Sequence, residues 1–263
     1  MLIKSNEKYI ASLISLWQKA FGDDEEYIRL FFKDAYYNSE TFAVLSEGEV
    51  VSSLYLLKAE IKSEGKIYKG RYLYAAATLS EHRGKGYMAK LIKEALAFAA
   101  ENNLDFIALV PANNGLYGYY ERFGFREAMY KYRLKIESET ATLRAFREID
   151  DWKEFYDIRS SAKCDMLIHD KVGTKYAFDC MKYAHSRVFA VSDKAYYVEG
   201  EELFFSDDGS VSQSEMLMRN LCGEPEIFSN INFGDAEKIR NGMVYCINDE
   251  LKNKEFYMNI ALD

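Results

Sequence analysis

Residues 72–98 constrain the fold of this chain more than any other stretch. Residues 72–79 are Tyr-Leu-Tyr-Ala-Ala-Ala-Thr-Leu, and such a run of aromatic and small apolar residues is typical of a β-strand. Residues 83–86, Arg-Gly-Lys-Gly, are basic and contain two glycines. Apolar side chains then recur at helical spacing, at Met88, Leu91, Ile92, Ala95 and Ala99. The stretch predicts a strand, a basic glycine-containing loop and a helix in direct succession.

This junction is suited to bind an anion such as a phosphate. The N–H groups of a first helical turn have no partner within the helix, and the helix dipole is positive at that end. Gly84 and Gly86 let a ligand approach the backbone closely, and Arg83 and Lys85 add positive charge. The alternative is that the glycines only shape a turn and the basic side chains are solvated. The loop matches neither the Walker A motif nor the dinucleotide motif Gly-x-Gly-x-x-Gly.

The surrounding sequence predicts a mixed α+β (α/β) fold for residues 1–136, with helices flanking a mixed sheet. Residues 105–111 are an almost continuous apolar run, as expected for a strand buried on both faces beside a parallel neighbour. Apolar periodicity, Asp caps and glycine turns place the other elements. We expect helices over 8–21, after Asp24, over 87–102 and over 113–122, and strands over 41–46, 50–61, 68–79 and 127–136.

A polar segment, residues 137–140, is the predicted boundary of a second, smaller α+β domain over residues 141–263. Helices are expected near residues 152–158, 176–185 and 214–221, with strands between and after them. This part is either a diverged copy of the first half or an unrelated α+β domain. It has no second Arg-Gly-x-Gly loop.

Composition and charge disfavour several classes of function. The net charge of −8 argues against nucleic-acid binding, which depends on Lys and Arg neutralising phosphates. The four cysteines are scattered without a Cys-x-x-Cys pair, so neither a zinc site nor a disulfide framework is expected. No apolar run is long enough to cross a membrane, and residues 1–7 lack a signal-peptide pattern. We therefore expect a soluble cytoplasmic protein, with its oligomeric state open and a dimer as one option.

Two motifs resemble those of the GNAT superfamily of acyl-CoA N-acyltransferases. The family's Gln/Arg-x-x-Gly-x-Gly/Ala motif is matched by Arg83-Gly84-Lys85-Gly86-Tyr87, while Met88 departs from the small residue at its last place. A second motif, Asn-x₆-Tyr-Glu-Lys/Arg-x-Gly-Phe, is matched by Asn113 and by residues 120–125. The resemblance covers residues 1–136. Relatives of the enhanced-intracellular-survival type are similar in carrying larger residues at the place of Met88 and in appending a C-terminal domain.

The resemblance implies that acetyl-CoA is the cosubstrate and that no metal is needed. The loop from Arg83 to Met88, including Lys85 and Tyr87, would hold the CoA pyrophosphate. The end of the preceding strand, around Thr78 and Leu79, would hydrogen-bond the pantetheine arm. Asn113 would bind the pantetheine amides, cap the following helix, or do both.

Acyl transfer from a thioester to an amine requires a neutral amine, a stabilised oxyanion and protonation of the leaving thiolate. A backbone N–H near residues 78–79 is the expected oxyanion donor. Tyr120 is the candidate general acid, because it stands in the second motif; the alternative is that it only packs, as most of the 21 tyrosines must. The general base stays open. Its candidates are ordered water, Glu26, His169 with Asp170, His185, and the C-terminal carboxylate of Asp263, the last by resemblance.

These observations favour an N-acetyltransferase that acts on a primary amine of a small molecule or peptide. The acidic balance is compatible with a cationic acceptor, such as a polyamine or an aminoglycoside. The alternative is a non-catalytic acyl-CoA-binding or sensor protein, which the departure at Met88 and the absence of an evident base would suit.

Overall fold

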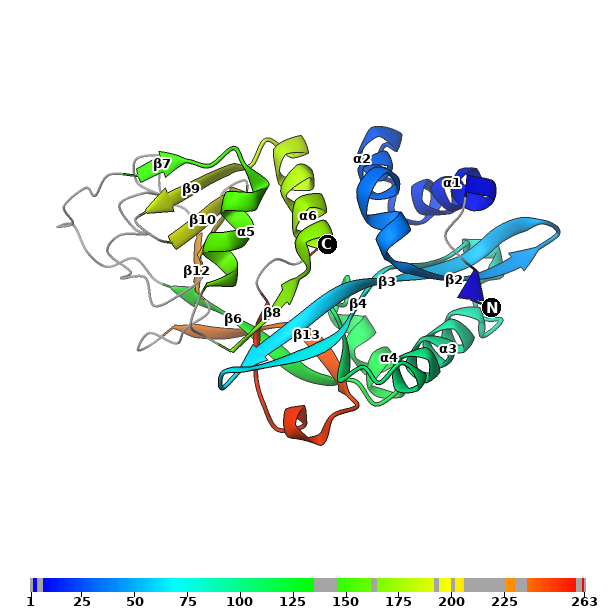
Figure 1. The fold of residues 1–263 in the computed structure, drawn as a ribbon. Helices are drawn as coiled ribbons and strands as arrows, with labels where there is room; N and C mark the ends of the chain where they lie inside the picture. Colours follow the sequence, from blue (N-terminus) through cyan, green and yellow to red (C-terminus); the bar gives the residue numbers. More distant parts are fainter. Residues whose placement is uncertain are drawn as a thin grey trace.

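A computed structural model describes residues 2–3, 7–134, 146–161, 165–191, 194–199, 202–205, 226–229, 236–258 and 262. Helices flank a large mixed sheet, which confirms the predicted fold class (Figure 1). In the described part of the chain the strand order is β1-β2-β3-β4-β5-β13-β6-β12-β11-β10-β9-β7, and β8 pairs with both β3 and β14. No helix among these residues is long and apolar enough to span a membrane.

Two N-terminal helices pack on one face of the sheet. Helix α1 (Ile10–Phe21) buries Leu13 and Trp17 and ends at Gly22, whose φ of 81° is in the left-handed region that glycine adopts without strain. The side chain of Asp24 accepts a hydrogen bond from the Tyr27 N–H and so begins α2 (Glu25–Leu30). A π-helical turn, Phe31–Ala35, continues it inward.

Three antiparallel strands form the N-terminal side of the sheet. They are β2 (Glu40–Ser46), β3 (Glu49–Ser63) and β4 (Lys66–Thr78), joined by hairpin turns at residues 47–48 and 64–65. Both residues of each turn have positive φ, which matches the twist of the strands they connect. Strand β1 (Leu2–Ile3) pairs with the outer edge of β2.

The predicted crossover is present. Strand β4 leads through the loop to α3 (Tyr87–Glu101), and β5 (Phe106–Leu109) returns parallel to β4 and fully buried. The strands touch closely at Gly70, where a Cβ would lie 2.5 Å from the ring and carbonyl of Phe106. Helix α4 (Tyr117–Glu121) and β6 (Arg126–Leu134) follow.

The C-terminal half contributes the remaining elements and shares the sheet of the first half. Strand β13 (Glu237–Cys246) lies between β5 and β6 and is antiparallel to both. Strand β8 (Met166–His169) pairs with β3. The others are β7 (Phe146–Glu148), α5 (Trp152–Ser160), α6 (Lys171–Tyr183), β9 (Arg187–Val191), β10 (Lys194–Glu199), β11 (Glu202–Phe205), β12 (Glu226–Ser229) and β14 (Tyr257–Met258).

Side chains from both halves form one buried core, which includes Phe31, Tyr55, Leu167 and Tyr176. The predicted boundary at residues 137–140 and the predicted helix over 214–221 lie outside the described residues. The division into two domains, and the origin of the second as a copy of the first, stay predictions.

Candidate active site

The loop between β4 and α3 has the backbone conformation of an anion-binding turn. Gly84 and Gly86 have φ values of 75° and 78°, in the left-handed region that is costly for other residues. A Cβ added to either would meet nothing within 4 Å, so open space lies beside the loop. Gly86 is the N-cap of α3, which directs the positive end of this helix into that space.

The N–H groups of this loop are available to a ligand. No described residue accepts a hydrogen bond from the backbone N–H of Gly84, Lys85 or Gly86. The first hydrogen bond of α3 runs from the N–H of Lys90 to the carbonyl of Gly86 at 3.0 Å. The N–H groups of Tyr87 and Met88, in the first turn, therefore precede the helical ladder and point out of its end.

The side chains around the loop are exposed and positive. Arg83 Nε donates to the Thr78 carbonyl at 3.2 Å, which ties the loop to the end of β4. Lys85 Nζ lies 3.5 Å from His82 Nδ1, and the His82 ring stacks on Tyr87 with centroids 6.3 Å apart. The half-buried Met88 packs against the core cluster that contains Leu91 and Ile92.

The two residues predicted at the end of β4 already have partners. Thr78 Oγ1 lies 2.8 Å from Ser52 Oγ, and the Leu79 N–H donates to the Val51 carbonyl at 3.0 Å. Because the Leu79 N–H already donates to Val51, it is a poor candidate as a donor to pantetheine or to an oxyanion. The Thr78 carbonyl accepts from Arg83 Nε. Their roles in binding stay predictions.

Strands β4 and β5 separate before β4 ends. Their parallel pairing covers only Gly70–Tyr72 opposite Phe106–Ala108, while β4 continues to Thr78. The β3–β4 register also shifts beyond Tyr74, where Ala75 has a φ of 45°. A β-bulge of this kind bends its strand and interrupts its ladder. Residues 75 and 76, where the ladder is interrupted, line the gap between the strands.

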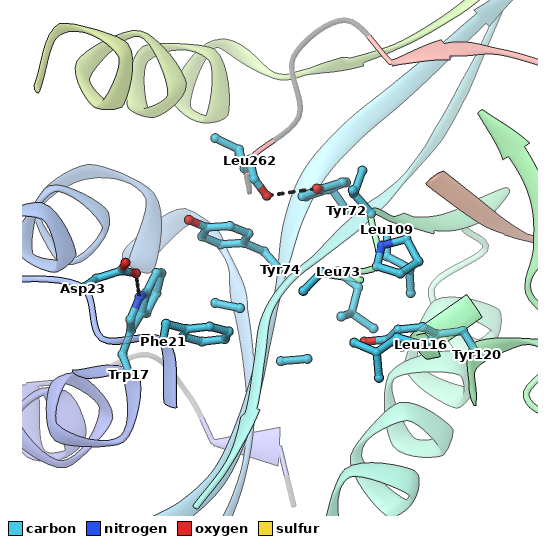
Figure 2. Close-up of a pocket in the computed structure, with 15 residues that line it drawn as sticks. Trp17, Phe21, Asp23, Tyr72, Leu73, Tyr74, Leu109, Leu116, Tyr120 and Leu262 are labelled. Atoms are coloured by element: carbon cyan, nitrogen blue, oxygen red, sulfur yellow. Dashed lines mark hydrogen bonds between the residues drawn. The ribbon is translucent and has the colours of Figure 1, made fainter. Parts of the chain in front are cut away.

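A cavity of about 440 Å³ occupies this gap (Figure 2). Its floor is residues 72–76 of β4, the last residue of β5 and the three residues after it (109–112), and its ends are helices α1 and α4. The other lining residues are Trp17, Phe21, Asp23, Leu116, Tyr120 and Leu262. A second cavity, of about 230 Å³, shares Phe21, Ala76, Leu116 and Tyr120 with the first and extends to Arg83 and Met88. A continuous path therefore leads from the phosphate loop to the larger cavity.

Tyr120 lies where the two cavities meet. Helix α4 holds it, and its side chain is only 7% exposed, packed edge-to-face on Phe125 with ring centroids 5.8 Å apart. Burial raises the pKa of the Tyr120 hydroxyl to about 12, so the phenol keeps its proton at neutral pH. Asn113, the other candidate from the second motif, caps the turn before α4. Its Oδ1 accepts a hydrogen bond from the Gly115 N–H at 3.0 Å.

Asp23 is the lining residue that the sequence analysis missed. Its position before α2 had suggested a cap, but Asp24 takes that role and leaves Asp23 facing the cavity. The indole Nε1 of Trp17 donates to Asp23 Oδ2 at 2.7 Å and fixes the carboxylate at the α1 end. The periodicity of apolar residues in the sequence gives no sign that Asp23 lines a cavity, because the cavity wall forms only when α1 packs on β4.

The base candidates named from the sequence lie elsewhere. Glu26 and His185 are exposed, and neither lines a described cavity. His169 is buried behind the cavity wall with its ring 5.0 Å from that of Tyr72, and Asp170 caps α6. Asp263 lies outside the described residues. The described residues contain no group of three side chains suited to hold a metal ion.

Comparison with known proteins identifies the domain and the fold. A family model described as an acetyltransferase (GNAT) domain matches residues 2–128. A conserved protein from Enterococcus faecalis, described as a probable N-acyltransferase, is 14% identical over 95% of this chain and 73% of its own, with a TM-score of 0.74. A GCN5-related N-acetyltransferase from Kribbella flavida is 16% identical with a TM-score of 0.67, and Eis1 from Mycobacterium abscessus is 10% identical with a TM-score of 0.69. These cover 95% and 94% of this chain, and each is covered over 73% of its own length. No curated protein matches the chain.

Proposed function

We propose that the protein transfers the acetyl group of acetyl-CoA to a primary amine of a small molecule or peptide, because residues 2–128 match a family model described as an acetyltransferase (GNAT) domain. The observation that carries the proposal is the position of Tyr120. This buried, protonated phenol stands where the cavity beside the phosphate loop adjoins a larger cavity with room for a second substrate.

The donor binds along the path between the two sites. The pyrophosphate of acetyl-CoA lies against the N–H groups of residues 84–88, with Arg83 and Lys85 adding charge. The pantetheine arm passes the side chain of Met88 and enters the gap between β4 and β5. Beyond Tyr72, β4 and β5 no longer pair with each other, and the pantetheine amides hydrogen-bond to backbone groups of these strands in place of that pairing. Asn113 directly follows Ala112, which lines the larger cavity.

The reaction is a direct attack without a covalent enzyme intermediate. The neutral amine nitrogen forms a bond to the thioester carbon, whose oxygen gains negative charge beside the backbone at residues 75–76. As the tetrahedral intermediate collapses, the C–S bond breaks and the Tyr120 hydroxyl gives its proton to the leaving thiolate. The proton that the nitrogen then loses returns to Tyr120 through the site, so the products are the N-acetyl amine, CoA thiol and an unchanged enzyme.

The alternative is a sensor that binds acyl-CoA without turnover. Of the base candidates that the structure describes, Glu26, His169, Asp170 and His185, none lines either cavity, which is the observation that favours it. An amine that reaches the site already neutral needs no such base, because its ammonium proton has passed to bulk water beforehand. The cavity of about 440 Å³ favours catalysis, since a sensor has no use for space beyond the acyl group.

The test is release of free thiol from acetyl-CoA in the presence of a panel of primary amines. The sensor alternative predicts acetyl-CoA binding with no release beyond the rate without amine. Tyr120→Phe should lower kcat by about a hundredfold with little change in acetyl-CoA affinity, as expected for loss of a general acid. Tyr117→Phe is the matched control, because Tyr117 is buried on the same helix but lines neither cavity. Equal effects of the two substitutions would exclude Tyr120 as the acid.

A further inference from the structure

The larger cavity has a charged end and a reactive end, and from this we propose the class of acceptor. The acceptor is a compact amine that carries a second cationic group across a short apolar spacer, as in an aliphatic diamine. Asp23 binds the distal ammonium while the other nitrogen attacks the thioester. This inference rests on the proposed acetyltransferase function, and it names which amines that function serves.

Asp23 is the only charged side chain among the described residues that line the cavity. Its carboxylate is held in place by the Trp17 indole, whose Nε1 donates to one oxygen at 2.7 Å. Trp17 is 3% exposed and packs on Phe31 and Tyr74, so this anchor is rigid. One preorganised carboxylate with an oxygen left over is suited to a single ammonium group.

The rest of the described wall is apolar or aromatic. Apart from the Tyr120 hydroxyl at the reactive end, the side-chain hydroxyls of this wall are already paired: the Tyr74 hydroxyl lies 2.9 Å from the Tyr176 hydroxyl, and the Tyr72 hydroxyl donates to the Leu262 carbonyl at 3.2 Å. An acceptor rich in hydroxyl groups, such as an aminoglycoside, would lose its water here without gaining partners. A methylene spacer has no hydrogen bonds to water that would be lost on binding. The aromatic faces of the wall also favour a cation beside Asp23.

The charged end is separated from the reactive end. Figure 2 shows Asp23 and Trp17 on one side of the cavity and Tyr120 with Leu116 on the other, with Phe21 and Tyr74 between. The separation matters because a carboxylate beside the attacking nitrogen would stabilise its inert ammonium form. A second ammonium held at Asp23 has the opposite effect, since like charge within one small molecule lowers the pKa of the reacting amine. Asp23 is therefore a binding residue and not the base.

The experiment compares diamines with monoamines of equal length on the full-length protein. We would measure kcat/KM by thiol release for 1,4-diaminobutane, 1,5-diaminopentane, butylamine and pentylamine, with the wild-type protein and Asp23→Asn. We expect the substitution to lower kcat/KM about tenfold for both diamines and to leave the monoamines within twofold. Differences in intrinsic reactivity between the amines cancel in this comparison.

Asp24→Asn is the matched control. It removes the same charge one residue away, but Asp24 caps α2 and lines neither cavity, and asparagine caps equally well. A similar loss in Asp24→Asn would mean that the acidic loop only attracts cations from solution. That result would overturn the inference.

Two further results overturn it. An equal fall for monoamines and diamines in Asp23→Asn would place Asp23 at the reacting nitrogen. Wild-type protein that acetylates monoamines at least as well as diamines, with no effect of Asp23→Asn, would leave the acetyltransferase function intact and remove the diamine preference. Thiol release from no amine at all would instead defeat the proposed function itself, and the inference with it.

Discussion

The two ends of the proposed substrate path, called here the donor end and the acceptor end, are built in different ways. The donor end is one contiguous loop, residues 83–88, whose function resides in two glycine conformations and a helix terminus. The acceptor end is assembled from α1, the loop before α2, strand β4 and Leu262 near the C-terminus. A binding site made by one contiguous loop forms whenever the strand–loop–helix unit folds. An assembled wall changes whenever one of its elements moves, so relatives can keep the donor and differ in the acceptor.

A single substitution at the donor end is expected to weaken the binding of acetyl-CoA. In Gly86→Val we expect acetyl-CoA affinity to fall about thirtyfold, corresponding to about 2 kcal/mol, because a β-branched residue disfavours the left-handed backbone that presents the N–H groups. Isothermal titration calorimetry measures this directly. The protein should still fold, since the added side chain enters open space.

Gly65→Val separates backbone strain from ligand binding. Gly65, in the β3–β4 hairpin, has a φ of 77° against 78° for Gly86, and a Cβ there also meets nothing within 4 Å. It should lose similar stability and keep its acetyl-CoA affinity. If both variants bind acetyl-CoA as the wild type does, the loop is only a turn, which was the alternative left open by the sequence.

The same contrast explains what the sequence could predict. The loop, the crossover and the buried strand β5 depend on short-range patterns, and the structure has them where those patterns place them. The position of β13 between β5 and β6 has no local signal, because pairing of strands more than a hundred residues apart is decided by tertiary packing. The bulge at Ala75 was equally invisible, since alanine rarely has a positive φ and nothing in its neighbours demands one.

The role of Tyr120, which lies between the two ends, can be tested through the pH dependence of kcat/KM. The Tyr120 acid acts in its protonated form, and burial raises its pKa to about 12, so it should not titrate between pH 6.5 and 10. The amine must be neutral, so kcat/KM should rise about tenfold per pH unit below the amine's own pKa. For an aliphatic amine with a pKa of about 10.4, kcat/KM should therefore rise across this range without a descending limb.

Steady-state kinetics across that range, corrected for alkaline hydrolysis of the thioester, provides the check. Tyr120→Phe should show the same rise at a lower level, because the rise belongs to the amine. A descending limb between pH 8 and 10 that disappears in Tyr120→Phe would show that the phenol titrates normally. Tyr120 would then be more exposed to water than its 7% accessibility indicates.

The acceptor end depends on the C-terminal segment being held against the sheet. Arg126, at the start of β6, donates from its Nη2 to the carbonyls of Leu251 and Lys254, both at 2.6 Å. Phe256 then bonds through its N–H to the Ala128 carbonyl at 2.8 Å. Leu262 is also part of the wall of the larger cavity. It is the only described residue of the second half that lines this cavity, and no described residue of that half lines the smaller cavity beside the phosphate loop.

Tyr72→Phe tests that division with the smallest change. It removes the hydroxyl that donates to the Leu262 carbonyl at 3.2 Å, a neutral hydrogen bond that contributes about 1 kcal/mol. We expect KM for the acceptor amine to rise about fivefold while the dissociation constant of acetyl-CoA stays unchanged, because the phosphate loop does not contact this segment. Tyr68→Phe is the control on the same strand: it removes a hydrogen bond to Glu250, also from the C-terminal half, at a place that lines neither cavity. Tyr68→Phe should leave both constants unchanged. A weaker acetyl-CoA affinity in Tyr72→Phe would show that the two ends are coupled through β4, and the acceptor wall could then not vary independently of the donor loop.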